Sequence, residues 1–142
     1  MRSPILWLLA AALLLTACSP RNPEANAEAL AEAKRHIAEG DETMTRLSKL
    51  NQFSPAYEVA TTLRRFTHDV EEWQRAYGKQ RARLTARGIS REESVDLTRR
   101  YKAAVEDLRS KVEQTDRRLA KRSDNEFYYA ELLRMREAMK KL

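Results

Sequence analysis

The stretch VATTLRRFTHDVEEWQRAYGKQRARL, residues 59–84, has the clearest pattern in the chain. Its apolar and aromatic residues recur in alternating steps of four and three positions, the spacing of a buried helical seam. The seam positions are Val59, Leu63, Phe66, Val70, Trp73, Tyr77, Gln80 and Leu84. We therefore predict a long helix that begins at Ser54-Pro55 and runs to Arg87, with Gly88 as its C-cap.

Two aromatic residues on this seam, Trp73 and Tyr77, are candidates for a ligand site. Large aromatic side chains at core spacing are more often part of the core, and we assign both to it. The pattern does not say whether the seam is buried within one chain or between copies. Formation of a homo-oligomer through Val59–Leu84 is therefore a second possibility.

A weaker apolar stripe precedes the seam, after a helix start signal at Asn22-Pro23. Its members are Leu30, Ala33, Ile37, Met44 and Leu47, with Gly40 at the missing position. Gly40-Asp41 either separates two helices or supplies a small residue where two helices approach closely. We predict one kinked helix over about residues 23–51.

Two more helices are expected after Gly88. Ser90 and Glu93 form a predicted capping box, and the helix that follows continues to about Arg122. Its stripe is Leu97, Tyr101, Ala104, Leu108, Val112, Thr115 and Leu119. Acidic residues lie four positions before basic ones in three pairs that support this helix: Asp96–Arg100, Asp107–Lys111 and Glu113–Arg117.

The last helix is predicted over about residues 125–141. Ser123-Asp124-Asn125-Glu126 has the form of a second capping box. The seam that follows is Tyr128, Leu132, Met135, Met139 and Leu142.

The fold class is all-α, since no alternating β-branched run occurs in the sequence. Short loops favour antiparallel neighbours. Residues 23–142 therefore form an up-and-down helical bundle of three to four helices, or a long helical hairpin with coiled-coil-like seams. In either arrangement the loop near residue 88 lies at the same end as residue 23, and the turn at 51–54 lies at the other.

The first residues, MRSPILWLLAAALLLTAC, have the features of a targeting segment. Arg2 supplies a positive charge, and Ile5–Leu15 is an apolar run too short to span a bilayer comfortably. We predict a signal peptide over residues 1–17. The alternative is an uncleaved transmembrane helix with an ordinary thiol at Cys18.

Leu15-Thr16-Ala17-Cys18 resembles the lipobox of bacterial lipoproteins. The resemblance implies lipidation of the Cys18 sulfur, cleavage before Cys18 and acylation of the new amino terminus with a fatty acid such as palmitate. Residues 18–22 are then a lipidated tether. Ser19 implies sorting to the outer membrane, on its periplasmic side, with the periplasmic side of the inner membrane as the alternative.

The chain is mildly basic, with 27 Lys and Arg against 21 Asp and Glu. Such a charge suits an anionic membrane surface or an acidic polymer, and the predicted export argues against nucleic acid. Five cations flank the loop near residue 88: Lys79, Arg81, Arg83, Arg87 and Arg91. We predict that they contact anionic head groups or an envelope polymer. The alternative is a solvated helix end, where cations suit the helix dipole.

Three aromatic residues are adjacent at 127–129, and neighbouring positions of a helix point in different directions. At least one of the three should face away from the core. We predict that Phe127 and Tyr129 contact a protein partner, or alternatively pack under the preceding loop.

No catalytic residue, metal site or cofactor is predicted. Glu28, Glu32 and His36 share a helix face, and His68 precedes Glu71 by three positions. Neither group has the paired Glu-x-x-His arrangement of di-iron bundles, and a solvated charged face is the simpler interpretation. Glycine-rich phosphate loops and serine elbows are also missing from the sequence.

We therefore expect a lipid-anchored, periplasmic-facing envelope protein that acts non-enzymatically. Its expected role is protein-binding or structural, as an accessory of a membrane or secretion assembly, with an envelope protein as partner. The alternative is an immunity, exclusion or chaperone-like helical binding lipoprotein.

Overall fold

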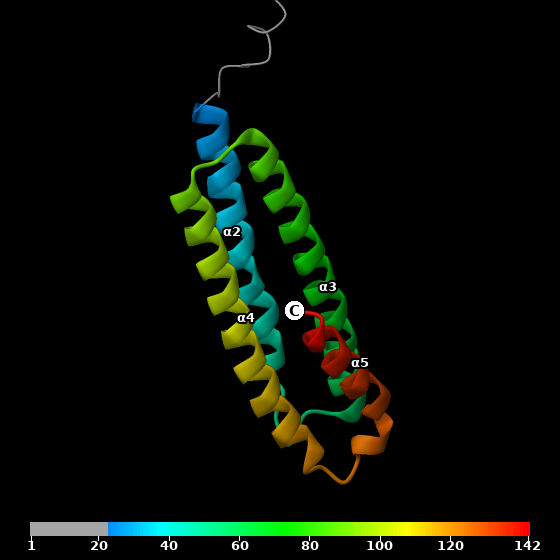
Figure 1. Ribbon diagram of the computed structural model, residues 1–142. Helices are drawn as coiled ribbons and strands as arrows, with labels where there is room; N and C mark the ends of the chain where they lie inside the picture. The colour runs from blue at the N-terminus through cyan, green and yellow to red at the C-terminus, as the bar shows by residue number, and fades with distance from the viewer. Residues whose placement is uncertain (1–22) are drawn as a thin grey trace, which may run out of the picture.

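The computed structural model describes residues 23–142, which form an all-α, up-and-down bundle, as predicted (Figure 1). Its elements are α2 (Pro23–Ser48), α3 (Ala56–Arg87), α4 (Arg91–Ala120), the short 3-10 helix η1 (Asn125–Phe127) and α5 (Tyr129–Lys140). The predicted signal peptide, Cys18 and the tether fall in residues 1–22 and lie outside the described residues.

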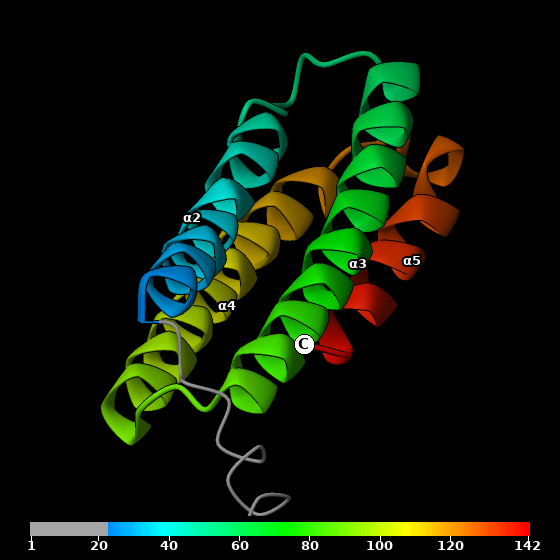
Figure 2. The same ribbon diagram turned by 90° about the horizontal axis from the view of Figure 1, so that it is seen from above.

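The bundle has two distinct ends (Figures 1 and 2). The start of α2 and the α3–α4 loop form its N-terminal end, where Arg87 Nη1 donates a hydrogen bond to the carbonyl of Ala25 at 3.1 Å. The α2–α3 loop and the α4–α5 connection form its distal end. The 32 residues of α3 run from one end to the other, a length of about 48 Å at about 1.5 Å per residue.

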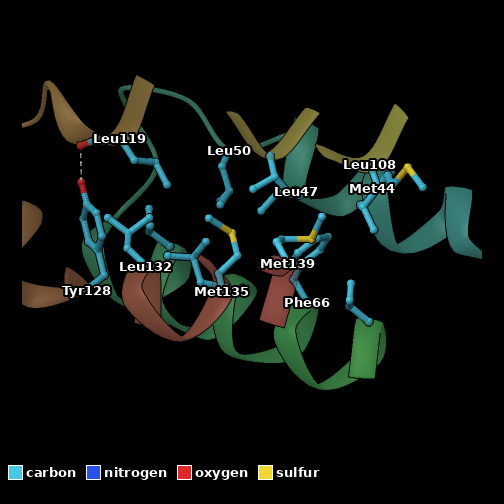
Figure 3. Packing of buried hydrophobic residues seen from close by; sticks show 14 residues of the cluster. Met44, Leu47, Leu50, Phe66, Leu108, Leu119, Tyr128, Leu132, Met135 and Met139 are labelled. Carbon is cyan, nitrogen blue, oxygen red and sulfur yellow. Dashed lines mark hydrogen bonds between the residues drawn. The ribbon is translucent and has the colours of Figure 1, made fainter. Parts of the chain in front are cut away.

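The seam of α3 is buried within one chain. Seven of its eight predicted positions are buried, and Gln80 is half-buried. In the distal half they pack with residues of α2, α4 and α5, among them Leu47, Leu108, Leu132 and Met135 (Figure 3). In the other half the buried cluster comes from α2, α3 and α4 alone. The seam is therefore not open to a second copy, and α5 covers only half of the bundle.

Gly40 allows α2 and α3 to approach closely. α2 continues unbroken through this position. A Cβ atom on Gly40 would lie 3.2 Å from two ring atoms of Trp73. Trp73 Nε1 donates to the carbonyl of His36, and His36 Nε2 donates to the carbonyl of Trp73, both at 3.0 Å. Trp73 therefore belongs to the core, where it links two helices.

Several local predictions are confirmed. Gly88 caps α3 with φ of 71°, and both halves of the capping box at Ser90 and Glu93 are formed. The three acid-to-base pairs of α4 are also present: Asp96–Arg100 at 2.9 Å, Asp107–Lys111 at 2.7 Å and Glu113–Arg117 at 3.3 Å.

The predicted capping box at residues 123–126 is wrong. The Asp124 carboxylate accepts hydrogen bonds from Arg122 Nε at 2.8 Å and from Arg122 Nη2 at 2.6 Å. With its carboxylate engaged by Arg122, Asp124 caps no helix, and the connection contains only the 3-10 helix η1 before α5 begins at Tyr129. The start of α3 also differs from expectation, because the Ser54 hydroxyl accepts from the amide of Asn51 and α3 has no side-chain cap.

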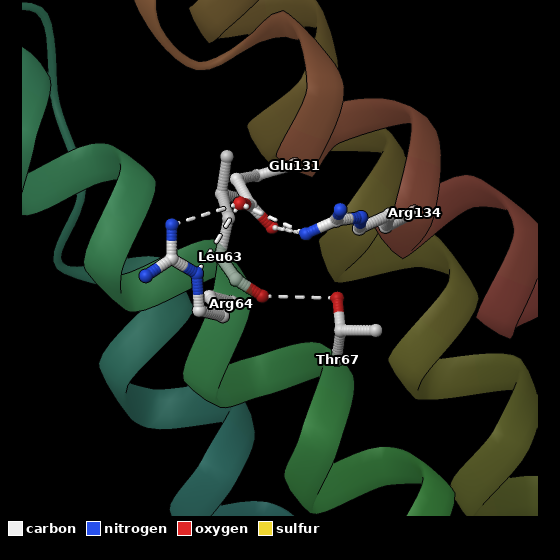
Figure 4. A network of polar contacts seen from close by, with 5 residues as sticks. All are labelled: Leu63, Arg64, Thr67, Glu131 and Arg134. Atoms are coloured by element: carbon white, nitrogen blue, oxygen red, sulfur yellow. Dashed lines mark hydrogen bonds and ion pairs between the residues drawn. The ribbon is translucent and has the colours of Figure 1, made fainter.

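A buried carboxylate fastens α5 to α3 (Figure 4). Glu131 is 6% exposed. It accepts from Arg64 Nε and Nη2 at 3.2 and 3.0 Å, and from Arg134 Nη1 at 3.2 Å. Two guanidinium groups thus compensate one buried charge, which would be costly to bury alone.

The close approach at Gly40 predicts opposite effects for the same substitution at two glycines. Gly40→Leu pushes against the Trp73 ring and should lower the free energy of unfolding by about 2 kcal/mol. Gly78→Leu adds a side chain where nothing lies within 4 Å of the Cβ position and should raise it by up to about 1 kcal/mol. Urea unfolding followed by circular dichroism measures both. Equal changes in the free energy of unfolding would contradict the close packing of Gly40 against Trp73.

The buried carboxylate predicts a second pair. Glu131→Ala should lower the free energy of unfolding by about 1–2 kcal/mol, because charge-assisted bonds to α3 are lost while the mostly exposed guanidinium groups return to water. Glu137→Ala, which removes an exposed carboxylate of the same helix, should change it by less than about 0.5 kcal/mol. An equal loss of stability in both variants would contradict a specific role of Glu131 in holding α5 against α3.

Candidate functional site

The five predicted basic residues lie at the N-terminal end of the bundle, as the antiparallel arrangement requires. All five are exposed: Lys79, Arg81, Arg83, Arg87 and Arg91. Apart from Arg87, which binds the Ala25 carbonyl, their side chains form no ion pair or hydrogen bond with any residue in the described range 23–142. Most of their charge is therefore available to an external anion.

These cations do not form one surface. Arg83 and Arg87 line a small hollow between α2 and α3, where Glu32 is also present. Arg81 lies beside α4 instead, and lines a shallow groove of about 540 Å³ with Arg99 and Lys102. The sequence analysis did not include Lys102 among the basic site residues. It could have been included, because residues 79–102 hold eight Lys and Arg against three Asp and Glu.

Asp96 compensates the other cations of this end. Its carboxylate lies 2.7 Å from Arg99, 2.9 Å from Arg100 and 3.4 Å from Lys34 of α2. Hydrogen bonds from Arg100 and Arg99 hold the pKa of Asp96 well below its usual range. Asp96 therefore ties α4 to α2.

At the distal end, two of the three adjacent aromatic residues face outward, as expected. Phe127 is 71% exposed and Tyr129 is 51% exposed. Tyr128 is buried and donates its hydroxyl hydrogen bond to the Leu119 carbonyl at 3.1 Å (Figure 3). Burial raises the pKa of Tyr128. Phe127 and Tyr129 thus both have a large exposed surface that is available for contact.

Two further aromatic residues at this end were missed. Phe53 is 84% exposed and Tyr57 is 76% exposed. They belong to the α2–α3 loop and the first turn of α3, and Arg122 Nη1 ties this loop to the α4–α5 connection by donating to the Asn51 carbonyl at 3.0 Å. The four exposed aromatic residues of neighbouring segments, here called the distal aromatic group, are Phe53, Tyr57, Phe127 and Tyr129. The sequence indicates their exposure in one way, because none of the four lies on a predicted apolar seam.

The histidines considered for metal binding have other neighbours. His36 is engaged with Trp73, and His68 lies 3.6 Å from Asp69. Within residues 23–142, no group of three or more His, Cys, Asp or Glu is placed to hold a metal ion. Over the same described range, the helices are too short or too polar to cross a bilayer.

Comparison of the chain with protein-family models, with curated protein sequences and with solved structures gives no match. Functional assignment therefore rests on the geometry of the two ends.

The low pKa of Asp96 predicts a pH-dependent link between α4 and α2. A carboxylate whose folded pKa lies below its unfolded value stabilises the fold above the unfolded pKa of about 4, and this contribution is lost as the pH falls through the folded value. The stability difference between the native chain and Asp96→Asn should therefore shrink as the pH falls from 6 to 2. Chemical unfolding at a series of pH values measures it, and a constant difference would contradict the assignment.

Proposed function

We propose that this chain is a lipid-anchored, periplasmic-facing envelope protein that binds another protein without catalysis, as an accessory of a membrane or secretion assembly. The observation that carries the proposal is the polarity of the bundle. Four cations without a partner in the described residues, Lys79, Arg81, Arg83 and Arg91, lie toward the end where α2 begins, and the distal aromatic group lies at the other end. The two ends are separated by the length of α3, about 48 Å.

The basic end suits a membrane surface. In the proposal, lipid on Cys18 holds the chain at the outer membrane, and only the short tether separates Cys18 from Pro23. The N-terminal end of the bundle then lies close to anionic head groups. Each well-placed Lys or Arg adds about 1 kcal/mol of attraction to such a surface, in addition to the attachment that the lipid on Cys18 supplies.

The distal end suits a protein. Exposed aromatic side chains are the residues that most often carry binding energy at protein interfaces. Their position far from the anchor leaves them accessible to a partner that is not itself at the bilayer surface. The anchored bundle is then a spacer that holds a contact site at a fixed height.

Capture of the partner tests the proposal. The tagged, lipidated chain is cross-linked mildly in cells, and the captured proteins are identified by mass spectrometry. We expect a few stoichiometric envelope proteins that are lost in Cys18→Ala and reduced in the double variant Phe127→Ala with Tyr129→Ala. Val95→Ala, which trims an exposed residue of the other end, is the control.

Two outcomes would contradict the proposal. Recovery of self-linked chains alone would point to an oligomer. Recovery of one soluble protein, retained equally by Cys18→Ala, would favour an immunity-type binder.

Membrane contact by the basic end gives a separate prediction. Exchange of Arg81, Arg83, Arg87 and Arg91 for Gln should weaken binding of the Cys18→Ala chain to phosphatidylglycerol vesicles at least tenfold at low salt. Exchange of four exposed cations nearer the distal end, Arg109, Arg117, Arg118 and Lys121, should have much less effect. Sedimentation with vesicles measures both, and equal losses would exclude a directed contact.

A further inference from the structure

A groove of about 210 Å³ lies between α2 and α3 toward the distal end. Buried side chains of Leu50 and Phe66 are part of its lining. The remaining lining residues are polar or charged and come from both helices. It is thus an apolar depression with a polar rim, a combination typical of binding sites.

Three threonine hydroxyls of this rim have no partner among the side chains that the structure describes, residues 23–40 and 43–142, or among the backbone groups of those residues: Thr43, Thr61 and Thr62. Other helical hydroxyls bond back to the carbonyl four residues earlier, as in Thr67, Thr85, Thr98 and Thr115. The groove therefore presents hydroxyls that remain free to donate to or accept from a ligand.

Three cations of the rim are also uncompensated. Arg46, Lys49 and Arg65 form no ion pair with any described residue, although two carboxylates line the same groove. Glu58 and Asp69 occupy the first and last lining positions of α3, and Thr61, Thr62 and Arg65 lie between them. The α3 side of the groove thus has its cation in the middle and an acidic residue toward each end, and the opposite side adds two cations, Arg46 of α2 and Lys49 just after it.

The N-terminus of α3 lies at one end of the groove. Its first turn contributes Glu58 to the groove, and no side chain caps its free amides. Uncapped amides and the helix dipole favour a negative group nearby.

The dimensions favour a chain segment over a small ion. Glu58 and Asp69 are eleven positions apart on α3, which corresponds to about 17 Å along the helix axis. An extended peptide covers that distance with about five residues. The exposed Phe53 and Tyr57 lie next to the Glu58 end in sequence, where they can contact apolar residues of the same segment.

We propose that this groove binds an acidic, extended segment of the partner protein. Carboxylates of the segment pair with Arg46, Lys49 and Arg65, and the threonine hydroxyls bond its backbone. The inference rests on the proposed function, because it names the chemistry of the partner that the distal end contacts.

A titration with hexaglutamate, blocked at both termini, tests the inference. The full chain in a non-ionic detergent carries ¹³C-methyl threonine and is observed by NMR. Saturable shifts are expected at Thr43, Thr61 and Thr62, and not at Thr85 or Thr98 near the other end. The triple variant Arg46→Ala, Lys49→Ala, Arg65→Ala should raise the Kd at least tenfold. The matched variant Lys79→Ala, Arg81→Ala, Arg83→Ala should leave it unchanged.

Three results would overturn the inference. Shifts confined to Thr85 and Thr98 would place peptide binding at the basic N-terminal end. Equal binding of hexaglutamine would remove the role of the carboxylates. Equal shifts from sodium acetate at the same carboxylate concentration would mean a small-anion site. None of these results affects the partner capture, which depends on Phe127 and Tyr129.

Discussion

The seam of α3 is the constraint on which the rest of this bundle depends. It supplies buried residues to both hydrophobic clusters and contacts α2 and α5 directly. Polar contacts then fix each neighbour in position. Trp73 of α3 and His36 of α2 exchange hydrogen bonds beside Gly40, and Arg64 of α3 holds the buried Glu131 of α5. One long helix with one apolar face therefore organises the chain, and polar bonds at its edges set the register.

The two ends of the bundle differ in packing and in the groups they expose. α3 has 32 residues and α5 has 12, so α5 covers only the distal half. Asp96 pairs with Lys34 of α2, and Glu131 pairs with Arg64 of α3, so each carboxylate links two helices. Cations outside these networks remain near the α3–α4 loop and in the groove between α2 and α3. Aromatic residues outside the seams remain exposed at the distal end. We therefore assign membrane and partner binding to the unpaired cations and exposed aromatic residues, which take no part in packing the helices together.

Local sequence signals were sufficient for the helices, because periodicity, Gly88 and the Ser90–Glu93 box act over a few residues. The start of α5 was mispredicted, since the pair of Arg122 with Asp124 replaces the expected cap. Tertiary structure decided the sites. Arg81 lies beside α4 and Arg83 beside α2, because these helices flank different sides of α3. The exposure of Phe53 depends on how the α2–α3 loop meets the α4–α5 connection. The sequence indicates that Arg81 and Arg83 point in different directions and that Phe53 is not on a seam, but it does not say which neighbouring element each one meets.

The central claim is that the basic end lies at the membrane and the distal end stands away from it. Energy transfer to acceptor-labelled lipids measures this directly, with a donor dye on Arg91→Cys or on Phe127→Cys of the lipidated chain in vesicles. The account predicts strong transfer from position 91 and much weaker transfer from position 127, because α3 separates the two ends by about 48 Å. Equal transfer from both positions, or stronger transfer from position 127, would contradict it.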